Sequence, residues 1–428
     1  MGIALLCVTL IVFMVIGVPI AFCTGLASML YLMSNPSIPS EVLSHRLTGS
    51  LFSLVLLALP AFLLVGRMFN VAGITDRIFD FAISLVGRIR GGLAQANAMA
   101  SMMFASMSGT AVGDAGGLGV IEMEMMKKAG YRPAFAAGIT AASSVLGPII
   151  PPSVAMVILG ATASVDIGRL FMGGVIPGIL MGISLMVYVY LYARFTAEGR
   201  SWPVTKHDLK TMLRNFRRAI LPLLTPVIII GCITFGVVTP TEAAVLAIDY
   251  ALLLGIVYRN ISWKRLLETL EDCIETTGVF MFIFASAGVF GWLLTLEQVP
   301  QAVSDLLFSL TTDPTVILFL IVLFLLIVGA FLDTTAAILL VTPMLIPIVQ
   351  QAGIDMIHFC IVLVVALIIG IITPPFGICL FVVSDVAKLP VTTVTRACLP
   401  YLVPMIIVVI LLVLFPGLST WLPRLIFG

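Results

Sequence analysis

The sequence predicts an all-α integral membrane protein built from two inverted repeats. Of its 428 residues, 61% are apolar and only 10% are charged, whereas soluble chains carry about 25% charged residues. Long apolar runs alternate with short polar connections, and glycines and prolines recur at a constant spacing between the two halves. This composition excludes a nucleic-acid-binding protein, a secreted disulfide scaffold and a disordered chain.

Each apolar run is expected to be helical, because a backbone group facing the lipid bilayer cannot lack a hydrogen-bond partner. The first run has no basic leader and no convincing cleavage site, so we expect it to be retained as membrane helix. It crosses either once, or twice with a break at Gly17–Pro19, and both alternatives stay open. The runs cover residues 3–33, 51–72, 93–125, 133–163, 168–193, 219–258, 276–296, 313–350, 356–386 and 398–417.

The polar connections predict how the runs are oriented. Basic residues gather in five connections, which the positive-inside bias assigns to the cytoplasm. The run 93–125 lies between two of them, so it is expected to enter the membrane and turn back as a helical hairpin. The run 313–350 has weakly charged flanks and predicts a matching hairpin opened from the outside. Residues 73–90 and 297–310 suit either amphipathic interfacial helices or ordinary connecting helices.

An internal repeat is the most informative feature of the chain. At an offset of 223 residues, glycines and prolines of the first half match those of the second: Ala129-Gly130 with Ala352-Gly353, Gly147 with Gly370, Pro151-Pro152 with Pro374-Pro375, and Pro177 with Pro400. Such matches carry weight because both residue types dictate backbone conformation. The halves have opposite charge flanks, as in the inverted repeats of secondary transporters.

This repeat divides the chain into three parts. Residues 1–200 are predicted to form the first inverted repeat, with scaffold helices, an interfacial helix, the cytoplasmic-side hairpin 93–125 and a broken helix at 133–163. Residues 201–218 are predicted to be a basic cytoplasmic linker. Residues 219–428 then form the second repeat, with the periplasmic-side hairpin 313–350 and a broken helix at 356–386.

A proline pair lies in the middle of each broken helix. Proline lacks an N–H and clashes with the carbonyl group four residues earlier, so Pro151-Pro152 is expected to free the carbonyls of Gly147 and Pro148. The second pair is expected to free those of Gly370 and Ile371. Freed carbonyl oxygens suit a small hard cation, and the N-terminus of the helix that restarts suits an anion. A kink used only for packing is the alternative.

The predicted hairpin tips place polar residues in apolar surroundings. Residues 106–117 bring hydroxyl groups, small residues and Asp114 together, and residues 329–336 do the same with Asp333. An aspartate at membrane depth is costly, so each is expected to be either functional or a helix cap. At the 223 offset Thr110 aligns with Asp333, and each tip is expected to face the proline break of its own half.

No catalytic constellation accompanies these motifs. The three histidines are isolated, no serine, histidine and acid share a segment, and the glycine-rich stretch 113–119 lacks the ending of a phosphate-binding loop. The seven cysteines are scattered and have no metal-like pair spacing. We expect Arg67, Glu242 and Asp249 to serve in structural pairing or at the interface. The sequence therefore predicts that the protein is not an enzyme.

Four motifs together resemble the large membrane (permease) subunit of tripartite ATP-independent periplasmic (TRAP) transporters: residues 108–115, 147–153, 329–335 and 370–377. The resemblance implies sodium-driven import of an organic acid, such as a C4-dicarboxylate or a sialic acid, across the bacterial inner membrane. It also implies an elevator-type fold similar to that of dicarboxylate/sodium symporters. The implied partners are a small four-helix membrane subunit and a periplasmic substrate-binding protein. A self-sufficient sodium/dicarboxylate symporter is the alternative.

The resemblance further implies at least two sodium ions, whereas the residues alone do not choose sodium over proton. Ser108 and Gly109 align with Phe331 and Leu332, so the two cation sites cannot use equivalent side chains. The first implied sodium site comprises Ser106, Ser108, Gly109, Thr110, Gly147 and Ile149. The second comprises Gly329, Asp333, Thr334, Thr335, Gly370 and Thr373. The carboxylate substrate is expected between the two tips, near Pro152, Ser153, Pro375 and Gly377.

Overall fold

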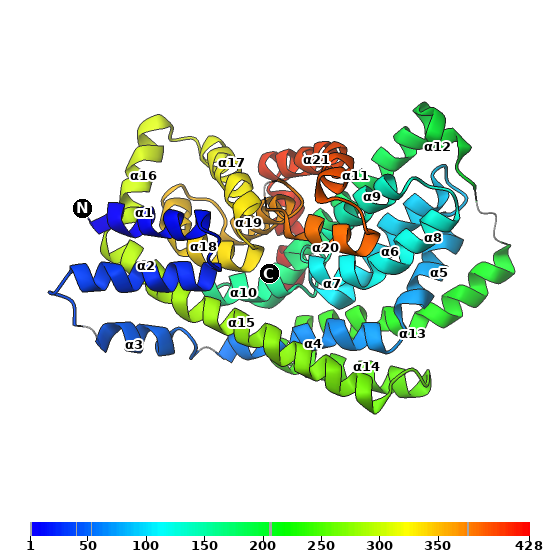
Figure 1. The fold of residues 1–428 in the computed structure, drawn as a ribbon, viewed down its shortest axis with the longest axis horizontal. Helices are drawn as coiled ribbons and strands as arrows, with labels where there is room; N and C mark the ends of the chain where they lie inside the picture. Colours follow the sequence, from blue (N-terminus) through cyan, green and yellow to red (C-terminus); the bar gives the residue numbers. More distant parts are fainter. Residues whose placement is uncertain (1, 40, 53, 205–207, 375) are drawn as a thin grey trace.

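All regular structure in the described part of the chain is helical (Figure 1). The computed structural model describes residues 2–39, 41–52, 54–204, 208–374 and 376–428. Among them, seven helices are long and apolar enough to cross a membrane, or eight if α4 and α5, which meet at a bend of 74°, count as one span. The all-α membrane architecture predicted from composition is therefore confirmed.

The first half of the chain contains thirteen of the helices, counting η1. They are α1 (Gly2–Val15), α2 (Ile20–Ser34), α3 (Glu41–Gly49), η1 (Leu54–Leu57), α4 (Ala58–Val71), α5 (Thr75–Val86), α6 (Gly92–Ser108), α7 (Ala111–Gly116), α8 (Leu118–Lys128), α9 (Pro133–Ser144), α10 (Val154–Ala163), α11 (Ile167–Phe195) and α12 (Ala197–Ser201). The run 3–33 is thus two helices, α1 and α2, which pack on each other and are separated at Gly17–Pro19.

The second half begins with two long helices and ends with a short one. Its helices are α13 (Leu209–Thr234), α14 (Pro240–Val257), α15 (Trp263–Leu296), α16 (Val299–Leu310), α17 (Pro314–Phe331), α18 (Thr334–Gln351), α19 (Met356–Gly370), α20 (Ile378–Ala387), α21 (Val391–Leu414) and α22 (Gly417–Phe427). The predicted linker 201–218 is helical from Leu209 onward, and α22 extends the chain past the last predicted run.

The helices on either side of the breaks exchange partners between the halves. α10 of the first half packs on α18 of the second, and α20 of the second half packs on α7 of the first. α9 and α19 also both pack on α21. α15 runs along this assembly, contacting α4 at one end and α18 and α2 at the other (Figure 1). The hairpins and broken helices of both halves therefore form one interlocked core.

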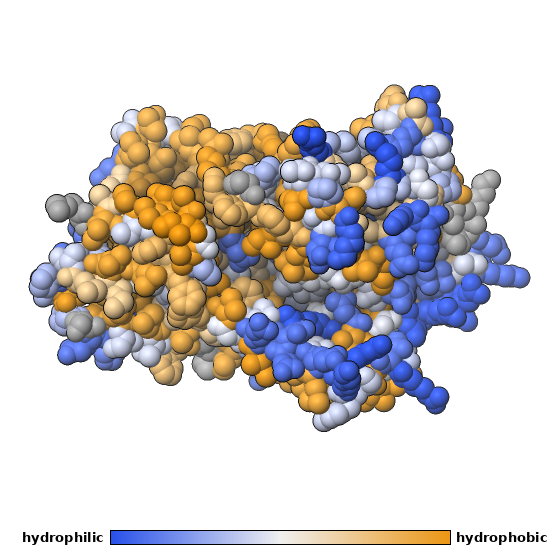
Figure 2. Space-filling model, in the orientation of Figure 1, coloured by the Kyte–Doolittle hydropathy of each residue, from blue (hydrophilic) through white to orange (hydrophobic). Residues whose placement is uncertain are grey.

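The outer surface divides into an apolar part and a basic part. Figure 2 shows hydrophobic residues over α1, α2 and α16 to α18, and hydrophilic residues concentrated at the opposite end, where α12 and the start of α13 lie. Many large apolar side chains of the spanning helices are exposed, such as Leu253 on α14 and Leu323 on α17. In water this surface would be unfavourable, whereas acyl chains solvate it at no cost.

Candidate functional site

Two tight turns form the tips of the helical hairpins. At the first tip, α6 ends at Ser108, Gly109 adopts a φ of +62° and Thr110 caps α7, with its Oγ1 accepting a hydrogen bond from the Gly113 N–H at 3.1 Å. Glycine supplies the left-handed conformation at this turn without steric cost. At the second tip, Asp333 caps α18, and its Oδ2 accepts from the Thr335 N–H at 2.9 Å.

Both predicted helix breaks are present. α9 stops at Ser144 and the helix resumes at Val154, whereas α19 stops at Gly370 and the helix resumes at Ile378. Ser153 caps α10, since its Oγ accepts from the Met156 N–H at 3.2 Å and donates to the Pro148 carbonyl at 2.5 Å. The chain between the helices is irregular where proline removes N–H donors.

Each tip is joined to the break of its own half by one backbone hydrogen bond. The Val154 N–H donates to the Gly109 carbonyl at 3.2 Å, and the Phe376 N–H donates to the Ala330 carbonyl at 3.2 Å. These positions are nearly equivalent in the two halves. The expectation that each tip faces its own proline break is confirmed.

Glycines allow the tips and breaks to touch backbone to backbone. A Cβ on Gly147 would lie 2.7 Å from the Thr110 carbonyl oxygen, and one on Gly370 would lie 2.2 Å from the Gly329 carbonyl carbon. Real Cβ atoms do not approach other atoms so closely. The matched glycines of the repeat are therefore required by contact between each hairpin and its broken helix, in addition to any local backbone preference.

The carbonyl groups of the two breaks differ from expectation. In the first break, the Gly147 and Ile149 carbonyls accept no backbone hydrogen bond within the described residues, whereas the Pro148 carbonyl is occupied by Ser153. In the second, the Gly370 carbonyl accepts from the Thr373 N–H at 2.9 Å and the Ile371 carbonyl from the Cys379 N–H at 3.2 Å. The prediction that Gly370 and Ile371 are freed is therefore wrong, because the chain folds back within the break.

The hydroxyl groups assigned to the cation sites are mostly engaged locally. Ser106 donates to the Met103 carbonyl at 2.6 Å, and Thr373 donates to the Ile369 carbonyl at 2.9 Å. Ser108 makes only a long contact, 3.4 Å, with the Thr110 carbonyl. A hydroxyl that donates to a carbonyl keeps its oxygen lone pairs, so these contacts are compatible with binding a cation.

A cavity of about 320 Å³ lies between the two tips. It is bounded on the other sides by α4, α15 and the starts of α10 and α20. Of its described lining residues, Asp333 alone is acidic and Arg67 alone is basic. The predicted site residues that line it are Ser108, Gly109, Thr110, Asp333, Thr334 and Thr335.

Of the residues expected to hold the substrate, Pro152, Ser153 and Gly377 do not line this cavity. Pro152 and Ser153 are buried against the first tip, and the Ser153 hydroxyl caps α10. Gly377 begins α20 outside the lining, and Pro375 lies outside the described residues. The expected place between the tips contains a cavity, but its walls come from other residues.

Arg67 is the functional candidate that sequence reasoning underrated. It projects from α4 into the cavity wall, where its Nη2 donates to Thr276 Oγ1 at 2.6 Å and its Nη1 lies 3.4 Å from Asp272 Oδ2. Thr276 and Asp272 belong to α15, which is distant in sequence. The structural pairing expected for Arg67 is present, and the same guanidinium group faces the cavity.

Asp114 occupies a different environment from Asp333. It is 2% exposed, and neither carboxyl oxygen has a hydrogen-bond partner among the described residues. Glu122, which sequence reasoning missed, is fully buried beside it and accepts from Asn97 Nδ2 at 2.7 Å. Thr110, and not Asp114, caps the turn, so the alternative that Asp114 is a cap is wrong. A buried carboxyl group within a polar cluster is typical of a site that holds a proton or a cation.

Glu242 and Asp249 lie away from the cavity lining. Glu242 forms a capping box at the start of α14, where its Oε2 accepts from the Thr239 N–H at 2.8 Å. The structural role expected for Glu242 is therefore confirmed.

The sequence profile described as "Tripartite ATP-independent periplasmic transporter, DctM component" matches residues 7–418. The chain belongs to this family. As a DctM component it is a transporter permease and not an enzyme, and it is a multi-pass integral membrane protein of a bacterial TRAP transporter.

This DctM chain is similar to relatives of known naming and, in fold, to a solved structure. It is 42% identical to the sialic acid TRAP transporter large permease protein SiaM of Vibrio cholerae, covering 96% of each chain. It is 37% identical to the C4-dicarboxylate permease DctM of the same organism, covering 100% of this chain and 99% of that one. In fold it is similar to the Alcanivorax borkumensis YdaH transporter, with a TM-score of 0.64 and 16% identity over 89% of this chain and 88% of that one.

Proposed function

We propose that this DctM chain imports an organic acid across the bacterial inner membrane together with sodium ions, using the cavity between the two hairpin tips. The observation that carries the proposal is the placement of Arg67 and Asp333 in the wall of one cavity. A guanidinium group is suited to a substrate carboxylate. The relatives named for sialic acid and for C4-dicarboxylates both transport carboxylates, which supports this substrate class.

The sodium sites are proposed at the contacts between tips and breaks. The first would use the free carbonyls of Gly147 and Ile149 with hydroxyls of the first tip. The second would use Asp333, whose Oδ2 accepts from the Thr335 N–H, with the hydroxyls of Thr334 and Thr335. Neutral oxygens joined by at most one carboxylate suit a monovalent cation, since higher charges require more anionic ligands.

An elevator mechanism is proposed from the packing of the two halves. The exchange of α10 and α20 between halves makes the two hairpins and broken helices one unit. α4 and α15, which bear Arg67 and Thr276, border the cavity from outside this unit. Movement of the unit against α4 and α15 would carry the cavity across the membrane, in the manner of transporters built from inverted repeats.

Delivery by partner proteins is the second part of the proposal. The family is named for a tripartite system, and this chain covers one component of it. We propose that a small four-helix membrane subunit and a periplasmic substrate-binding protein complete the transporter. The binding protein would then select the organic acid before it reaches the cavity.

Reconstitution tests the proposal directly. The chain, with its small subunit, is placed in proteoliposomes under an imposed inward sodium gradient, with labelled sialic acid or succinate supplied alone or with a cognate binding protein. Uptake that needs both the gradient and the binding protein is expected. Uptake without the binding protein would instead support a self-sufficient symporter, and uptake without sodium would contradict the cation sites.

A further inference from the structure

A second cavity, of about 520 Å³, lies where α11 ends, and it shares no residue with the cavity between the tips. Three of its described lining residues are arginines and none is acidic. The arginines come from the connection between α5 and α6, from α11 and from α12. The full lining is Arg90, Gly91, Ala193, Arg194, Phe195, Gly199, Arg200, Trp202 and Val204.

Close backbone contacts hold these segments together. A Cβ on Gly199 would lie 2.4 Å from the Ala193 Cα, so α12 packs directly on the end of α11. Gly91, with a φ of +91°, brings the turn before α6 against the same helix, and a Cβ there would lie 2.9 Å from Val189 Cγ1. The three segments that bear the arginines are therefore packed closely against one another.

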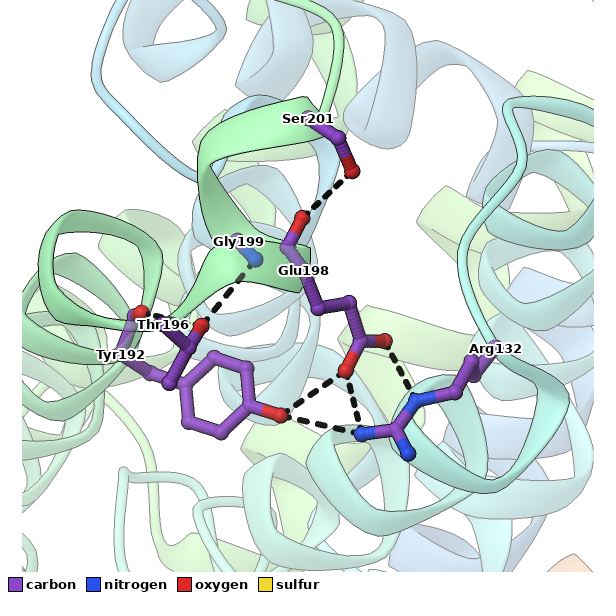
Figure 3. A network of polar contacts seen from close by, with 6 residues as sticks. All are labelled: Arg132, Tyr192, Thr196, Glu198, Gly199 and Ser201. Carbon is purple, nitrogen blue, oxygen red and sulfur yellow. Dashed lines mark hydrogen bonds and ion pairs between the residues drawn. The ribbon is translucent and has the colours of Figure 1, made fainter.

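The acidic side chain of α12 does not neutralise the arginines. Figure 3 shows Glu198 turned toward Arg132, whose Nε donates to Glu198 Oε1 at 2.6 Å, while the Tyr192 hydroxyl donates to Oε2 at 3.0 Å. The Glu198 carboxylate raises the pKa of the Arg132 guanidinium. Arg90, Arg194 and Arg200 take part in none of the ion pairs formed by the described residues. The cavity is consequently an uncompensated positive site.

Trp202 adds a buried aromatic ring to the cavity wall. Its ring stacks on Tyr131 and on Tyr192, with centroids 4.5 and 5.6 Å apart, and the residue is only 6% exposed. Its indole N–H has no hydrogen-bond partner among the described residues. An indole N–H can only donate, so the unmet requirement is for an acceptor oxygen.

An exposed apolar stripe of α11 leads to this cavity. It consists of side chains spaced four residues apart, a row that winds around the helix by about 40° at each step, because the α-helix has about 3.6 residues per turn. The first four are each between 45% and 51% exposed, and the last, in the cavity wall, is 69% exposed. The stripe comprises Ile179, Ile183, Val187, Leu191 and Phe195.

We propose that this cavity binds the phosphate headgroup of an anionic phospholipid, with an acyl chain along the α11 stripe. Arginine fits phosphate oxygens well, because its planar group presents several donors at once. Basic pockets between membrane helices at the interface are suited to such headgroups. Free phosphate would satisfy the arginines, but it would leave the stripe without a ligand.

Native mass spectrometry of the purified chain, titrated with phosphatidylglycerol or phosphatidylcholine, tests the site. Wild-type protein is expected to bind one phosphatidylglycerol molecule preferentially. The triple variant R90Q/R194Q/R200Q should lose roughly a hundredfold in affinity, because each basic residue near a bilayer surface contributes about a factor of five. The variant R90K/R194K/R200K should retain most of the preference, which separates loss of charge from loss of folding.

A matched control variant tests whether the effect is specific to this cavity, and a competitor tests whether the ligand is a lipid or free phosphate. R214Q/R217Q/R218Q removes three exposed arginines of α13, and it should leave the preference unchanged. Equal loss in this control, or full retention in R90Q/R194Q/R200Q, would overturn the proposal. Millimolar inorganic phosphate should not displace the lipid. Displacement by phosphate alone would show a site for free phosphate and would overturn the assignment to lipid.

Discussion

The two halves use related backbones to build unlike hairpin tips and helix breaks. In the first, the Gly147 and Ile149 carbonyls of the break accept no backbone hydrogen bond from the part of the chain that the structure describes, and the tip offers hydroxyl groups. In the second, the break closes on itself through Thr373 and Cys379, and the tip presents the carboxylate of Asp333. The two repeats therefore bend at equivalent positions, but the oxygen atoms that each half presents there are different. We expect the first site to depend on backbone and the second on one side chain.

The largest expected effect is at Asp333. Asn replaces Asp well as a helix cap, so D333N removes charge while keeping the start of α18. Sodium-driven uptake in proteoliposomes should fall at least about a hundredfold, since a charged ligand is lost at membrane depth. D313N, at the exposed cap of α17, is the matched control and should transport normally. Normal uptake by D333N would show that the Asp333 carboxylate does not bind the cation.

Substituting the contact glycines should show how tightly each tip packs on its break. G370A places a Cβ 2.2 Å from Gly329, whereas G147A places one 2.7 Å from Thr110. Overpacking of this kind costs about 3 kcal/mol or less, so G370A should lower the thermal midpoint more than G147A. G278A in α15, where a Cβ meets nothing within 4 Å, serves as the control. Equal midpoints for G370A and G278A would show that the tip and break separate easily.

Arg67 tests whether the cavity between the halves binds the carboxylate. R67Q should raise the KM for the organic acid about tenfold, because a charge-assisted hydrogen bond contributes about 1.5–3 kcal/mol. The sodium dependence should change little. R424Q breaks a comparable pair, Arg424 with Asp355 at 3.2 Å, away from the cavity, and should leave KM unchanged. An unaltered KM in R67Q would show that Arg67 only pairs with α15 and does not bind the carboxylate.

The proline pairs offer the smallest and most discriminating comparison. P151A returns an N–H that can occupy the free Gly147 carbonyl, so the sodium concentration for half-maximal uptake should rise a few fold. P374A should change it less, because the Gly370 carbonyl already accepts from Thr373. Titrating sodium in the uptake assay measures both. A larger effect in P374A would reverse the assignment of backbone and side-chain sites.

Sequence reasoning located the bends and the tips, whose residues form part of the cavity wall, but not the part of the wall that α4 and α15 supply. The breaks between Ser144 and Val154 and between Gly370 and Ile378 follow from the proline pairs alone. Arg67 reaches the cavity only because α4 and α15 pack beside the tips, and no local pattern encodes that contact. Of the residues predicted to hold the substrate, Ser153 caps the helix that it precedes and does not line the cavity.

The sequence by itself determined that this protein is helical, lies in a membrane and bends at paired points. Those properties are local: lipid offers backbone groups no water to bond with, and proline and glycine act on their own turns. Only the tertiary structure decided which carbonyls stay free, that Asp114 is buried beside Glu122, and that Arg67 and Asp333 share a cavity. These depend on contacts between segments far apart in the chain, which fix the energy of each polar group.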